Sequence, residues 1–166
     1  MSSAHSTAEW SELFVATAGA AAALAGLLFV AVSINVDRIL AFAGLPERAL
    51  EALLVLLGVL VASVLCLAPG IDPDALGWLL LAASGVIAFA VVALKRRSLP
   101  HREGRSRAET AGQLVLSGAG TLPFLVGAIS LIAGSGGGLY WLLGGIVGAF
   151  AATVTNAWVL LIEILR

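Results

Sequence analysis

The amino-acid sequence predicts an all-α membrane protein, a polytopic bundle of five transmembrane helices. Its 166 residues are 60% hydrophobic and only 11% charged, whereas soluble domains carry about a quarter charged residues. The nine basic residues flank the same ends of five long apolar segments, which is the asymmetry that marks the cytoplasmic side of integral membrane proteins. We therefore expect residues 1–166 to form a single transmembrane domain.

The first apolar segment, 13–34, contains no charged residue. At about 1.5 Å per residue it is long enough to cross a hydrocarbon core of ~30 Å. A cleaved signal peptide is the alternative, but this segment is too long for one and lacks a basic region before it. The following stretch, 36–43, has its apolar residues on one helical face, so it either extends the first helix or lies along the inner membrane surface.

The second and third apolar segments, 49–68 and 76–94, are predicted to form a hairpin of transmembrane helices. Pro46 precedes the second segment at a position that favours the start of a helix. The polar stretch 95–109 then follows and holds six of the nine basic residues. It is predicted to be a cytoplasmic loop, and its 95–107 part either contacts anionic lipid head groups or serves only to fix the topology.

The fourth and fifth segments, 111–133 and 139–162, are predicted to be the last two transmembrane helices. Pro123 lies near the middle of the fourth and removes a backbone hydrogen bond, which predicts a kink. The intervening glycine-rich stretch, 134–138, predicts a tight turn.

The orientation follows from the basic loop. If 95–109 is cytoplasmic, five spans place the N-terminus outside and the C-terminus inside. The outer interface would then hold four aromatic residues, as membrane interfaces commonly do. These are Trp10, Trp78, Tyr140 and Trp141.

Stripes of small residues predict where helices approach one another closely, because lipid-embedded helices associate through close backbone contact. The first helix carries Gly19 and Gly26 on such a stripe, and the fifth carries Gly144 and Gly148. We expect these two helices to make the closest contacts, within one chain or between copies. The amount of small-residue surface favours a homo-oligomer.

Polar residues near the predicted inner ends of the helices form the candidate site, since polarity inside a membrane is costly and often functional. Two ion pairs are predicted, Asp37 with Arg48 and Arg38 with Glu51. The set is interpreted either as a clasp that fixes the helices or as a polar vestibule. Its members are Asn35, Asp37, Arg38, Arg48, Glu51, Gln113 and Asn156.

The sequence offers no recognisable catalytic chemistry. Its two histidines, His5 and His101, fall outside the predicted helices, and its single cysteine, Cys66, lies within an apolar segment. No metalloprotease, nucleophile-elbow or phosphate-loop motif is present. We therefore expect no enzyme activity, no cofactor, no metal site and no nucleic-acid partner.

Three short stretches near the N-terminus carry a resemblance: LLFVAVSIN at 27–35, RIL at 38–40 and LPERALE at 45–51. They are similar to a family of small, uncharacterised integral membrane proteins of actinobacteria and other high-GC bacteria. The resemblance covers about the first 70 residues and implies the bacterial cytoplasmic (inner) membrane. Some members are labelled modulators of a membrane-anchored AAA protease, which implies a regulatory membrane-protein partner.

Two functions from different classes fit these observations. One is an oligomeric pore or ion channel whose inner polar residues form an entrance. The other is a non-conducting scaffold or regulator that binds another membrane protein or lipid through its helix faces.

Overall fold

The computed structural model describes residues 7–42, 44–98 and 107–165, and this part of the chain is helical throughout its regular structure. Five of its helices are long and apolar enough to cross a membrane, so the chain is a multi-pass membrane protein with five candidate spans. This confirms the predicted all-α, five-span class. The elements are η2 (Thr7–Trp10), α1 (Ser11–Ile34), α2 (Val36–Ala41), α3 (Leu45–Leu67), α4 (Pro73–Ser98), α5 (Arg107–Ile132) and α6 (Leu139–Leu165).

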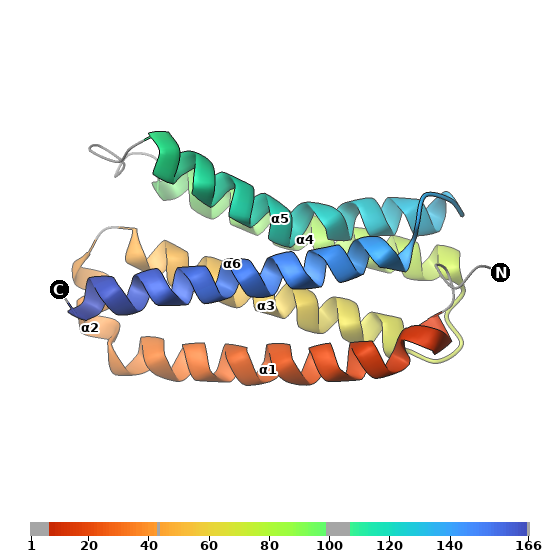
Figure 1. Ribbon diagram of the computed structural model, residues 1–166, viewed down its shortest axis with the longest axis horizontal. Helices are drawn as coiled ribbons and strands as arrows, with labels where there is room; N and C mark the ends of the chain where they lie inside the picture. Colours follow the sequence, from red (N-terminus) through yellow and green to blue (C-terminus); the bar gives the residue numbers. More distant parts are fainter. Residues whose placement is uncertain (1–6, 43, 99–106, 166) are drawn as a thin grey trace.

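The five long helices lie side by side in an elongated bundle, with α2 at one end (Figure 1). We call this the basic end, because the described basic residues of α2, α3 and α4 lie there: Arg38, Arg48, Lys95, Arg96 and Arg97. The opposite end, where η2 and the α3–α4 connection lie, is the acidic end and carries Glu9, Glu12, Asp72 and Asp74.

The helix α4 continues to Ser98, so Lys95, Arg96 and Arg97 are helical. The predicted loop, 95–109, was therefore too long at both ends, since 95–98 belong to α4 and 107–109 belong to α5. Lysine and arginine are good helix formers, and their charges interact favourably with the C-terminal end of the helix dipole. The stretch 99–106 of the expected loop lies outside the described residues.

The segment after α1 forms a separate short helix instead of extending α1. Asn35 has φ −110° and ψ 20°, which ends α1 and begins α2. One side of α2 is buried through Ile39. Gly44, at φ +90°, then supplies the left-handed backbone needed for the turn into α3, whose first turn contains Pro46 as predicted.

The central helix of the bundle is α3, which packs against α1, α4 and α6. In its most apolar stretch 44% of the residues are buried, against 22% in α1 and in α4. α1 therefore lies at the edge of the bundle and rests mainly on α3. Thr17 of α1 and Ser63 of α3 share a buried hydrogen bond of 3.0 Å at this interface.

α5 and α6 pack closely against each other. The sequence predicted the closest contacts between the first and fifth helices, α1 and α6, and within the chain this prediction was wrong, because those two helices touch only slightly. A β-carbon added at Gly148 would overlap the carbonyl oxygen of Ala119, and one added at Gly120 would lie 3.2 Å from Cα of Ala149. Pro123 has no N–H to donate to that same Ala119 carbonyl. α5 nevertheless remains one helix through Pro123, and it changes direction near its middle (Figure 1).

The other three glycines of the predicted packing stripes have a different environment. A β-carbon added at Gly19, Gly26 or Gly144 would meet nothing within 4 Å. Gly148 therefore packs within the chain, whereas Gly144, one turn away, faces outward. The predicted small-residue stripe of α1, which includes Gly19 and Gly26, is therefore open on the outside of the bundle.

The glycine-rich stretch 134–138 forms a tight turn at the acidic end, as predicted. Four of its glycines have positive φ, and the hydroxyl of Ser130 accepts a hydrogen bond of 2.8 Å from the backbone of Gly138. The rings of Trp10 and Tyr140 meet edge to face nearby, with centroids 4.8 Å apart. This contact ties η2 to the start of α6.

Candidate functional site

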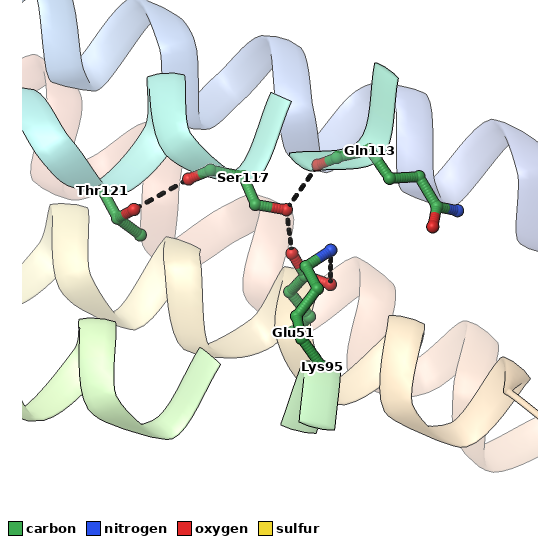
Figure 2. A network of polar contacts seen from close by, with 5 residues as sticks. All are labelled: Glu51, Lys95, Gln113, Ser117 and Thr121. Carbon is green, nitrogen blue, oxygen red and sulfur yellow. Dashed lines mark hydrogen bonds and ion pairs between the residues drawn. The ribbon is translucent and has the colours of Figure 1, made fainter. Parts of the chain in front are cut away.

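The candidate site centres on Glu51, a carboxylate in the second turn of α3 that is only 5% exposed. The ammonium group of Lys95, from α4, lies 2.9 Å from one carboxylate oxygen. The hydroxyl of Ser117, from α5, donates a hydrogen bond to the other. Three helices thus converge on one buried charge (Figure 2).

The hydrogen bonds continue along α5 (Figure 2). The Ser117 hydroxyl also lies 2.8 Å from the backbone carbonyl of Gln113, and the Thr121 hydroxyl donates to the carbonyl of Ser117 at 2.8 Å. Because a hydroxyl has one proton, Ser117 can donate either to Glu51 or to Gln113 at a given moment.

Arg48 joins the cluster from the first turn of α3. The Gln113 amide, oriented with its oxygen toward Arg48, accepts hydrogen bonds from the guanidinium, with the Nε contact at 3.2 Å. Arg48 and Glu51 are three residues apart on α3 and so lie on the same side of that helix. We call these residues the polar cluster: Arg48, Glu51, Lys95, Gln113, Ser117 and Thr121.

The electrostatics of the polar cluster depend on the pairing of Glu51 with Lys95. Their side chains are only 6% and 16% exposed, so neither charge has full access to water. A buried charge is tolerated only when it is paired and hydrogen-bonded. Glu51 has both an ion-pair partner and a hydroxyl donor, which satisfies this requirement.

The polar cluster lies in the part of the bundle where α5 and α6 separate. Toward the basic end, α5 rises away from α6 (Figure 1). The contacts of Glu51 with Lys95 and Ser117 connect α3 to α4 and α5 in this region. The cluster therefore connects the α4–α5 pair to the central helix.

Only part of the predicted site comes together. Arg48, Glu51 and Gln113 belong to the polar cluster, but the partner found for Glu51 is Lys95, whereas the sequence suggested Arg38. The remaining candidates are positioned by other elements. Asn35 lies at the α1–α2 junction and donates to the Ala31 carbonyl at 2.9 Å, Asp37 and Arg38 are exposed on α2, and Asn156 is half-buried on α6.

Sequence reasoning missed Lys95, Ser117 and Thr121. The signal for the two hydroxyls was present, because Gln113, Ser117 and Thr121 follow one another at intervals of four and share one face of α5. Lys95 was assigned to a loop. Its position at the end of an apolar run is one from which a lysine can reach back along the helix.

Hollow spaces lie beside the helices of the described chain. A cavity of about 20 Å³ lies between α3, α4 and α5 beside Thr121 and Ser84, which is room for about one water molecule. A larger groove of about 590 Å³ runs between α1 and α6, with mainly apolar walls and Asn35 among its lining residues.

Within the described ranges, no three histidine, cysteine, aspartate or glutamate side chains are grouped so that they could hold a metal ion. Comparison with protein-family models, with curated proteins and with solved structures found no match to this chain.

Proposed function

We propose that this protein is a non-enzymatic, non-conducting membrane scaffold or regulator that binds other transmembrane helices. We further propose that it self-associates, with α1 of one copy packing against α1 of a second copy. The observation that carries the proposal is the open small-residue face of α1. We place the protein in the bacterial cytoplasmic membrane with its N-terminus outside. The segregation of basic residues supports this orientation, and the sequence resemblance supports the membrane.

The outer face of α1 is suited to close helix contact. Gly19, Ala22, Ala23 and Gly26 are all exposed, and a β-carbon added at either glycine meets nothing. Their spacing gives two small-xxx-small pairs, the pattern that lets two lipid-embedded helices approach closely. α1 rests on α3 through another side, which includes Phe14, so the open face is available to a partner helix.

The geometry of the polar cluster favours the non-conducting function. Its carboxylate is neutralised by Lys95 within the same chain, as in a clasp. It joins α3, α4 and α5, whereas the small-residue face lies on α1. An assembly built on α1 would therefore have glycine and alanine at its contact, with the charged groups enclosed within each chain.

A homo-oligomeric channel is the second candidate, because Glu51 is an ionisable group within a membrane-spanning helix and such groups often mark ion pathways. The polar cluster would then be the cytoplasmic vestibule. This function requires the Glu51–Lys95 pair to open to water.

Conductance separates these functions. We expect the purified protein in planar bilayers to give no more current than protein-free membranes. A reproducible current whose ion selectivity changes in Glu51→Gln, with assembly unchanged, would establish the channel in place of the scaffold.

Self-association is tested on α1. Gly26→Leu is expected to convert the oligomer into a monomer without loss of fold, since the new side chain meets no atom within the chain but blocks close helix approach. Light scattering after size-exclusion chromatography in a mild detergent measures the mass. Gly85→Leu is the matched control, because a β-carbon added at this position on α4 also meets nothing within 4 Å. An oligomer that survives Gly26→Leu, or a wild-type monomer, would contradict the proposed contact.

The orientation is tested by cysteine labelling in a Cys66→Ala background. A membrane-impermeant maleimide added to intact cells should modify a cysteine placed at Asp72 and spare one placed at Arg97, both of which are exposed positions. The reverse pattern would invert the topology.

A further inference from the structure

A groove of about 350 Å³ lies between α4 and α5 toward the basic end. Most of its surface is apolar, and three of its lining side chains, Val92, Leu114 and Leu122, are between 50% and 59% exposed. In a membrane-spanning bundle these side chains face lipid. The groove is therefore accessible from the bilayer.

One end of the groove is cationic. Lys95 and Arg96 line it there, directly after the apolar run of α4, and Ser117 lines it from α5. Basic residues at the end of a transmembrane helix lie at the depth of the lipid phosphates. The groove thus has apolar walls within the membrane and two cations at the depth of the lipid head groups.

We propose that this groove is a binding site for an anionic phospholipid, with one acyl chain between α4 and α5 and the phosphate on Arg96 and Lys95. Basic pockets between transmembrane helices are a recurrent way of holding such head groups. The two cations at one end of the groove complement a phosphate, and its apolar remainder accommodates an acyl chain.

The site is coupled to the polar cluster through Lys95 and Ser117, which belong to both. Lys95 faces Glu51 at 2.9 Å and also lines the groove, so a bound phosphate shares this ammonium group with the carboxylate. Glu51→Gln removes the negative charge that competes with the phosphate for Lys95. The lipid affinity of that variant is expected to rise.

The test uses the full-length protein in a neutral detergent, with phosphatidylglycerol or phosphatidylcholine of identical acyl chains added. Phosphatidylglycerol should raise the thermal unfolding temperature in a concentration-dependent way and remain bound in native mass spectrometry, because a ligand of the folded state stabilises it. Phosphatidylcholine should do neither. Equal effects of the two lipids, or the same protection from inorganic phosphate alone, would overturn the proposal.

Charge variants locate the head group. Arg96→Gln should weaken phosphatidylglycerol binding about fivefold, the effect of one basic group at the membrane surface. Arg97→Gln is the control, since Arg97 is equally exposed and does not line the groove. Equal losses in both variants would reduce the effect to general surface charge and contradict the site.

A filling variant locates the acyl chain. Gly118 lines the groove, and a β-carbon there would meet only Cδ1 of Leu122, at an ordinary 3.5 Å. Gly118→Leu should abolish phosphatidylglycerol binding, whereas Gly112→Leu, on the same helix at an open position, should retain it. Unchanged binding in a folded Gly118→Leu protein would overturn the groove. If that variant does not fold, the comparison of Arg96→Gln with Arg97→Gln decides the question.

Discussion

Replacing Lys95 with methionine is expected to lower the free energy of unfolding by about 3–5 kcal/mol, the usual cost of removing one partner from a buried ion pair. Glu51, which is 5% exposed, would keep the hydrogen bond from the Ser117 hydroxyl but would lose the cation paired with its charge. Methionine preserves most of the length and apolar character of the lysine stem, so the change isolates the charge. Chemical unfolding in detergent micelles provides the measurement.

The reciprocal change should be milder. Glu51→Gln keeps an oxygen for the Ser117 hydroxyl, and Lys95, with 16% of its side chain exposed, can turn its ammonium group toward the interface. The double variant Glu51→Gln with Lys95→Met should therefore lose less than the sum of the two single losses. Strict additivity would show that the pair contributes no coupling energy, and Arg97→Met controls for the loss of a basic residue at the same end.

Gly148→Leu is the second substitution with a large expected effect. Even the first carbon of the new side chain would overlap the backbone carbonyl of Ala119, and a backbone atom cannot move aside as the tip of a flexible side chain can. Overpacking of this kind costs about 1–3 kcal/mol or more. We expect loss of the folded protein or a marked fall in its unfolding temperature.

The matched control is Gly144→Leu, one turn earlier on α6. A β-carbon there meets nothing within 4 Å, so the same chemical change should leave the unfolding temperature nearly unaltered. If the two variants were equally stable, α5 and α6 would not approach as closely at this point as described. If Gly144→Leu changed only the oligomer mass, it would identify a second surface for helix association.

The result for Lys95→Met will show which role the polar cluster has. A large loss of stability together with retained assembly would mark the cluster as the clasp between the α4–α5 pair and α3. The same clasp contains the lysine that faces the proposed lipid site. An anionic lipid would then act on the helix arrangement through Lys95, because the phosphate and Glu51 share that cation.

The sequence by itself determined the five-span class. Membrane insertion is governed by the length of each apolar run and the placement of charges at its ends, and both properties are local and can be read in order along the chain. The tight turn at 134–138 and the helix start near Pro46 were predictable for the same reason, since glycine and proline restrict the backbone locally. Glu51 was identified because a carboxylate inside an apolar run is conspicuous.

Which residues contact one another was decided only by the tertiary structure. Arg38, Arg48 and Lys95 all lie at the basic end, and hydropathy cannot distinguish among cations at one depth; the packing of α4 beside α3 brings Lys95 to Glu51. Likewise, Gly144 and Gly148 are equivalent in the sequence pattern, yet only Gly148 meets a neighbouring backbone. The rotation of each helix about its axis depends on contacts with helices distant in sequence, and a local pattern does not contain that information.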